Sequence, residues 1–183
     1  IGDQAFSGCS NLTSVNIPTS VKSIGDSAFR ECSNLTSIDI PTSVTSIGDS
    51  AFYNCSSLTS IDIPSSVKSI GDQAFSGCSS LISVTIGSSS IGYAAFRECS
   101  SLASVTIKST VTSIGYYAFY NCSRLTSIDI PTSVKSIGDE AFSGCSSLTN
   151  VTIGSSSIGD DTFRECSNLT RVTIKSTVTS IGR

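Results

Sequence analysis

Three amino acids are missing from this 183-residue chain, which has no histidine, no methionine and no tryptophan. Without histidine, the chain lacks the side chain that most often acts as a general base in catalysis. Charged residues make up only 14% of the chain, and the net charge is −3. This composition provides no basic surface for nucleic acid, so nucleic acid is not an expected partner.

Long apolar runs are also missing. No run approaches the ~20 apolar residues that a helix needs to cross a bilayer, so membrane insertion is not expected. The hydrophobic content of 38% is nevertheless sufficient for a packed core. The chain begins at Ile1, without an initiator methionine or a secretory signal, which is also expected of a mature secreted protein or of a fragment.

One short repeat fills the chain. Its pattern is I-G-x-x-x-F-x-x-C-S-x-L-x-x-[IV]-x-I, in most copies followed by P-x-S-V-x-S. The units begin at Ile1, Ile24, Ile47, Ile70, Ile91, Ile114, Ile137 and Ile158, and residues 181–183 begin another copy. Most units have 23 residues, whereas those beginning at Ile70 and Ile137 have 21. A repeat of this length over the whole chain predicts one solenoid spanning residues 1–183.

The apolar pattern within each unit predicts its local structure. Residues 12–17 alternate, with Val15 and Ile17 on one face, as in a β-strand. The S-V-x-S-I-G segment predicts a second short extended piece, and A-F-x-x-C a single helical or 3₁₀ turn. At Gly2 and its equivalents we expect a positive φ or a close approach between coils. Stacking would bury the apolar face of each unit against the next. The expected fold is an eight-coil, right-handed leucine-rich-repeat solenoid with parallel strands.

These features resemble a known family. The run from Cys55 to Phe75, CSSLTSIDIPSSVKSIGDQAF, is similar to the BspA-type leucine-rich repeat, and the resemblance covers the whole chain. It implies an extracellular or cell-surface protein that binds proteins or cell-surface ligands, for instance in adhesion.

Two irregularities lie on top of the repeat. The 21-residue units lack the proline and the valine that follow the strand, which should tighten one corner and interrupt the valine ladder. After each phenylalanine the units read Ser-Gly, Arg-Glu and Tyr-Asn in turn, and then the cycle restarts. The chain therefore also has a period of three units.

No catalytic or cofactor site is expected. The eight cysteines occupy one position in every unit, which predicts a ladder of free core thiols rather than disulfides. There is neither a C-x-x-C motif nor a histidine for zinc. Aspartates also recur at fixed positions, which gives them similar environments instead of the contrasting ones that an acid–base pair needs. A calcium site on these aspartates has only weak support, and we expect no enzyme activity.

The outward side of the strand ladder is the expected binding face. Its side chains are small, polar and weakly charged, with few of the aromatic and arginine anchors that concentrate binding energy. The candidate residues are Ser37, Asp39, Ser60, Asp62, Ser83, Thr85, Ser104, Thr106, Ser127 and Asp129.

Two further groups of surface residues are candidates. The aromatic group is Tyr93, Tyr116, Tyr117 and Tyr120, which fits either an adhesive patch or half-buried packing at a corner. Possible N-glycosylation sites in N-x-[S/T] sequons are Asn11, Asn34, Asn54, Asn121, Asn150 and Asn168.

Neither end of the repeat has a unit that resembles a cap. Solenoids normally end in capping units with a polar outer face. We therefore expect each end to meet further coils or another copy of the chain. Two functions stay open: a protein-binding or adhesion module, and a structural unit that stacks head to tail into a filament.

Overall fold

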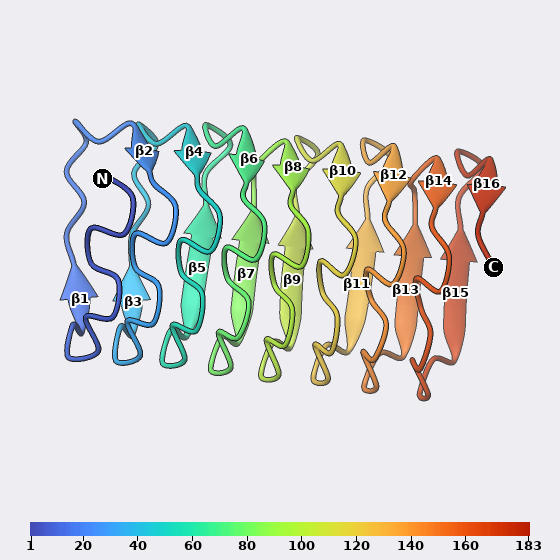
Figure 1. Cartoon of the computed structure of the whole chain (residues 1–183). Coiled ribbons are helices and arrows are strands. Elements are labelled where there is room, and N and C mark those ends of the chain that lie inside the picture. The colour runs from blue at the N-terminus through green and yellow to red at the C-terminus, as the bar shows by residue number, and fades with distance from the viewer.

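The computed structural model describes all residues 1–183 and contains sixteen short strands and no helix. Each turn of the chain, here called a coil, contributes one strand to each side of a solenoid (Figure 1). The odd-numbered strands are β1 (Ser14–Val15), β3 (Ser37–Ile38), β5 (Ser60–Ile63), β7 (Ser83–Ile86), β9 (Ser104–Ile107), β11 (Ser127–Ile130), β13 (Asn150–Ile153) and β15 (Arg171–Ile174). The even-numbered strands are β2 (Ser23–Ile24), β4 (Ser46–Ile47), β6 (Ser69–Ile70), β8 (Ser90–Ile91), β10 (Ser113–Ile114), β12 (Ser136–Ile137), β14 (Ser157–Ile158) and β16 (Ser180–Ile181).

All strand pairs are parallel and join equivalent residues of successive coils. The even-numbered strands form one eight-stranded sheet from β2 to β16. The odd-numbered strands form three shorter sheets, β1–β3, β5–β7–β9 and β11–β13–β15. Ser60 is opposite Ser83, which is opposite Ser104, so the register never shifts between coils. The parallel-strand solenoid expected from the repeat is confirmed.

A continuous core runs along the inside of the stack. Phenylalanine, leucine, isoleucine and cysteine side chains of successive coils lie on their own copies. Adjacent phenylalanine rings are nearly parallel, at 4–9°, with centroids 5.0–5.6 Å apart. The interior rings, such as Phe75, have no exposed surface, whereas Phe6 in the first coil is 40% exposed.

The A-F-x-x-C segments form hydrogen-bonded turns, so the expected helical or 3₁₀ turn is not confirmed. Backbone N–H groups alternate in direction here. The N–H of Phe29 donates to Ala51 in the next coil, and that of Arg30 donates to Ser27 in its own coil. A positive φ on both sides of this stretch, 54° at Ser27 and 59° at Glu31, produces the alternation. Every second N–H donates to the neighbouring coil instead of to a carbonyl four residues earlier, so the segment cannot continue as a helix.

The corner glycines meet the second of the two alternatives expected for Gly2 and its equivalents. Positive φ values lie instead at the fourth and eighth positions of the units. The close approach is present, because a Cβ on Gly115 would lie 2.6 Å from the carbonyl oxygen of Gly92. The glycines are therefore required by the spacing between coils.

The two short coils interrupt the valine ladder as expected. The fully buried Ser88 and Ser155 occupy this part of the core, where longer coils place Val67 or Val134. Gly87 replaces the proline, and a Cβ there would lie 2.8 Å from the carbonyl oxygen of Ile63. No segment forms a helix long and apolar enough to cross a membrane.

The eight cysteines are free, and all but Cys9 are buried. Each buried thiol donates a hydrogen bond to the carbonyl of a phenylalanine in the preceding coil; the Sγ of Cys55, for instance, lies 3.1 Å from the oxygen of Phe29. Burial raises the pKa of Cys55 to about 12 and that of Cys166 to about 11. The interior thiols therefore carry little of the thiolate that reacts with electrophiles.

We expect titration of the native protein with an aromatic disulfide at pH 8 to detect one fast thiol, Cys9. All eight thiols should react after denaturation, because unfolding removes both the burial and the raised pKa values. Several fast thiols in the native protein, or two or fewer after denaturation, would contradict a ladder of free, buried cysteines.

Replacing Phe75 by alanine should lower the free energy of unfolding by about 3–5 kcal/mol, the usual cost of emptying a buried aromatic site. The matched variant Phe6→Ala should cost clearly less, because that ring is already partly exposed. Urea denaturation followed by circular dichroism measures both values. Equal losses would show that the phenylalanine ladder is not the core of the stack.

Candidate functional site

The outward side of the odd-numbered strands is a flat polar surface. The strand pattern buries Ile61 and Ile63 and leaves Ser60 and Asp62 exposed. Register places Asp62 beside Thr85, and Thr85 beside Thr106. A shallow depression of ≈ 250 Å³ lies on this face. Its lining includes Ser37, Asp39, Ser60, Asp62, Ser83 and Thr85, so these six candidate residues lie together.

The other four strand-face candidates continue the same surface. Ser104 and Thr106 belong to β9, and Ser127 and Asp129 belong to β11. All four are exposed, but they lie outside the depression.

Two lysines that the sequence analysis did not single out also lie on this face. Lys108 Nζ is 3.9 Å from Asp62 Oδ1, and Lys175 Nζ is 3.6 Å from Asp129 Oδ1. Each lysine reaches across a short coil, where Gly87 or Gly154 has no side chain in the way. Because these side chains are exposed, the pairs add little stability and mainly set the charge pattern of the face. The sequence contained a signal for these lysines: the repeat position after the strand is proline in one coil, glycine in the next and lysine in the one after that.

The corner aspartates have a structural task that the sequence did not reveal. In most coils the Oδ1 of this residue accepts the N–H of the equivalent residue in the next coil, as from Asp72 to Asp49 at 2.8 Å. We call Asp3, Asp26, Asp49, Asp72, Asp139 and Asp160 the aspartate ladder. These side chains are at the surface and hold consecutive corners together. No group of three or more metal-ligating side chains is present.

Two tyrosines interrupt this ladder. Tyr93 and Tyr116 take the place of aspartate in consecutive coils. Neither side chain accepts a backbone N–H, so the N–H groups of Tyr116 and Asp139 have no hydrogen-bond partner in the chain.

The four candidate tyrosines divide into two pairs. Tyr93 and Tyr116 are 40% and 54% exposed. Tyr117 and Tyr120 are half-buried and pack edge to face, with ring centroids 5.6 Å apart, and Tyr93 packs similarly on Tyr117 at 5.8 Å. The Tyr117 hydroxyl donates to Glu140 Oε1 at 2.8 Å, which raises the pKa of Tyr117. Tyr117 and Tyr120 are therefore packed at the corner, Tyr93 is partly packed, and Tyr116 has the most open ring of the four.

Arginines lie over the tyrosines of the three-unit cycle. The Arg30 guanidinium is 4.5 Å from the centroid of Tyr53, and that of Arg97 is 5.3 Å from Tyr120. Both arginines also contact the adjacent glutamate of their own coil, Glu31 or Glu98. Arg97 is thus already engaged by a carboxylate and a ring.

All six sequon asparagines are exposed. Asn168 Nδ2 donates to the carbonyl of Ser146 at 2.7 Å, and Asn150 Nδ2 donates to the Thr149 hydroxyl at 2.8 Å. Asn54 and Asn121 have a positive φ and lie against Gly77 and Gly144 of the next coil. Asn11 and Asn34 make no side-chain hydrogen bond.

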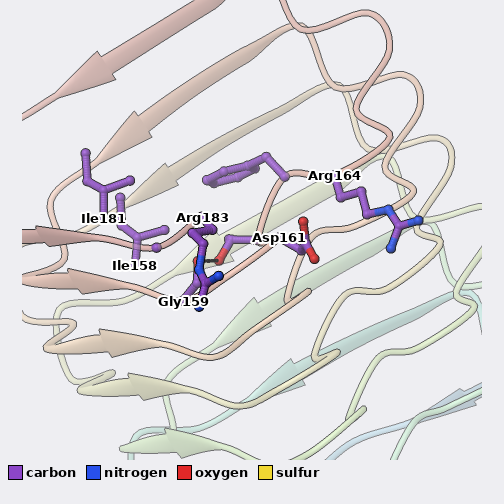
Figure 2. A pocket seen from close by; sticks show the side chains of 9 residues that line it. Ile158, Gly159, Asp161, Arg164, Ile181 and Arg183 are labelled. Carbon is purple, nitrogen blue, oxygen red and sulfur yellow. Dashed lines mark hydrogen bonds between the residues drawn. The ribbon is translucent and has the colours of Figure 1, made fainter.

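The end faces of the stack differ from its sides. A hollow of ≈ 310 Å³ lies on the C-terminal coil, where Ile158 and Ile181 lie side by side and Asp161 and Arg164 stand at the other end (Figure 2). Val172, Ile174 and Ile181 are 46%, 50% and 59% exposed there, and Phe6 is exposed at the opposite end.

Known proteins share both the repeat and the fold. The family model of the BspA type leucine-rich repeat region matches residues 1–91 and 87–183. A leucine-rich cell surface protein from Faecalibacterium prausnitzii is 26% identical with a TM-score of 0.61, over 96% of this chain and 63% of that chain. The T. pallidum leucine-rich repeat protein is 32% identical with a TM-score of 0.68, over 92% and 70%.

A leucine-rich repeat protein from Eubacterium ventriosum is 30% identical with a TM-score of 0.79, over 84% of this chain and 43% of that chain. The chain thus spans less than two thirds of the F. prausnitzii and E. ventriosum proteins. No curated protein sequence matches it.

Replacing Asp49 by alanine should lower the melting temperature by about 2–4 °C, because the N–H of Asp72 loses its charged acceptor. The matched variant Asp39→Ala removes an exposed aspartate that makes no hydrogen bond, and its melting temperature should stay unchanged. Differential scanning calorimetry compares the two variants. Equal changes in the melting temperature of the two variants would contradict a structural role of the aspartate ladder.

Proposed function

This chain belongs to the BspA type leucine-rich repeat family, and we propose that it is a non-catalytic, extracellular or cell-surface module that binds protein partners through its strand face. The main support is the fixed register of β5, β7 and β9, which holds a row of exposed Ser, Thr and Asp side chains on a rigid surface. A rigid surface loses little conformational entropy when it binds. The F. prausnitzii relative is itself described as a cell surface protein.

The depression on β3, β5 and β7 is the proposed centre of contact. It combines hydroxyl groups, which donate and accept hydrogen bonds, with the carboxylates of Asp39 and Asp62. Because tryptophan is absent and arginine is scarce on this face, the affinity of one module should be modest, on the order of micromolar. Repetition of modules on a surface would raise the total affinity through avidity.

A non-catalytic role rests on the character of the polar groups. The chain has no histidine, and its ladder aspartates each hold a backbone N–H of the next coil. These residues supply hydrogen bonds between coils, which supports a structural task for them rather than a catalytic one.

The binding proposal is tested with the double variant Ser60→Arg, Ser83→Arg. Both serines are exposed, so the solenoid should stay folded while two large cations cover the depression. We expect wild-type protein to bind at least one of a panel of immobilised extracellular-matrix proteins by surface plasmon resonance, and the variant to lose at least about tenfold in affinity.

The matched control is Ser69→Arg, on the exposed side of the opposite sheet. It should bind like wild type. Absence of binding to every panel protein, or equal binding by the double variant, would count against the strand face as the contact surface.

We propose, as a second function, head-to-tail stacking into a filament. Ile174 and Ile181 lie on one end face and Phe6 on the other, and a second copy stacked in register would cover them. Sedimentation velocity at rising concentration should then show growing assemblies that Ile181→Lys abolishes. A single monomeric species at every concentration would reject this function.

A further inference from the structure

The interruption of the aspartate ladder coincides with a groove. The groove measures ≈ 370 Å³ and follows the ends of β8, β10, β12 and β14. Tyr116 and Asp139 line it, together with Ser113, Ser136 and Ser157 and the corner glycines. Its volume lies in the range of small-molecule sites. It is on the sheet opposite the strand face, so it is separate from the protein-binding surface proposed above.

Residues that line the groove carry unused hydrogen-bonding groups of both kinds. The backbone N–H groups of Tyr116 and Asp139, one coil apart, have no acceptor within the chain. Asp139 accepts the N–H of Asp160 through Oδ1, and its other oxygen accepts no hydrogen bond. The hydroxyls of the three lining serines can both donate and accept. A ligand that fits must therefore supply donors and acceptors side by side.

The charges in the groove disfavour anions. No lysine or arginine lines it, so nothing balances the charge of an anion. The one charged lining group is the Asp139 carboxylate, which accepts a backbone N–H through Oδ1 and can accept a further hydrogen bond from a neutral hydroxyl. A neutral ligand rich in hydroxyls fits this set of groups.

The exposed Tyr116 ring adds an apolar component. Tyr116 lines the groove and is 54% exposed, whereas Tyr93, in the preceding coil, does not line it. A sugar ring has an apolar C–H face that can lie on an aromatic ring, and hydroxyls at its edge that donate and accept. An extended peptide fits less well along this line, because its carbonyls on one edge repeat every ~6.6–6.8 Å, whereas coils repeat every ~4.8 Å.

We propose that this groove binds a neutral saccharide, with Tyr116 as the stacking surface and the two free N–H groups as donors to sugar hydroxyls. Tyr93 contributes by leaving the N–H of Tyr116 free. At both positions an aspartate would have formed a hydrogen bond between two coils. The tyrosine that stands there forms none, so a backbone N–H stays free. The loss of stabilising bonds beside the groove is typical of functional sites.

Native affinity electrophoresis tests this proposal, with gels that contain dextran, mannan, xylan or mixed-linkage β-glucan, and gels that contain heparin. Wild-type protein should be retarded by at least one neutral polysaccharide and not by heparin. Tyr116→Asp should weaken that interaction at least about tenfold, because it removes the ring and supplies an acceptor to the N–H of Asp139. Tyr93→Asp should weaken it too, by occupying the N–H of Tyr116.

The same two variants have a second readout. Each restores one bond of the aspartate ladder, so each should raise the melting temperature by about 2–4 °C while it weakens retention. The control Tyr53→Ser removes a tyrosine outside the groove, and polysaccharide gels should retard this variant as strongly as wild type. The double variant Ser60→Arg, Ser83→Arg should also be retarded like wild type, which separates this site from the strand face.

Three results would overturn the proposal. The first is migration unaffected by all the neutral polysaccharides, and the second is retention by Tyr116→Asp equal to wild type. The third is capture of a matrix protein through Tyr116 in the absence of any polysaccharide effect, which would assign the groove to a protein partner.

Discussion

Every coil of this protein must find, in the next coil, an identical partner at an identical position. The parallel strands, the phenylalanine stack, the thiol-to-carbonyl bonds and the aspartate ladder are four expressions of this one constraint. A shift of one residue between neighbouring coils would break all four of these interactions at once. This explains why strands of only two residues keep a single register. It also explains the glycine at each corner, where the backbones of successive coils are too close for a side chain.

The constraint leaves only a few places where the chain can vary without loss of the stack. Outward strand positions are free, and there the surface changes from Asp39 and Asp62 to Thr85 and Thr106. The corner position is partly free, since replacing aspartate costs a single bond between coils. The two consecutive tyrosines at that position are therefore informative: they differ from their surroundings where variation has a structural cost and where a groove lies beside them.

The sequence predicted the architecture because the repeat itself carries the packing information. The periodic positions of Phe29, Cys32 and Leu35 indicated the core, and the two short units correctly indicated the break in the valine ladder. The A-F-x-x-C segment was expected to form one helical or 3₁₀ turn. Its hydrogen bonds instead go to the neighbouring coil, a tertiary effect that local propensity does not contain.

The candidate sites could be predicted only in part. Alternation within the strand was sufficient to name Ser60 and Asp62 as outward residues, but the contact of Lys108 with Asp62 across a short coil depends on the three-dimensional stacking of the coils. Likewise, the recurrence of aspartate was visible in the sequence, whereas its bond to the next backbone N–H was not. The binding role of these residues stays a prediction.

Amide hydrogen exchange, read residue by residue, tests the central claim most directly. If register between coils governs the structure, the turn amides of Phe52 and Phe75 should be as protected as those of the strands. The corner amides of Asp49 and Asp72, bonded to the ladder, should exchange slowly, and those of Tyr116 and Asp139 should exchange fast. Uniform protection of all four corner amides, or rapid exchange at Phe52 and Phe75, would contradict the account.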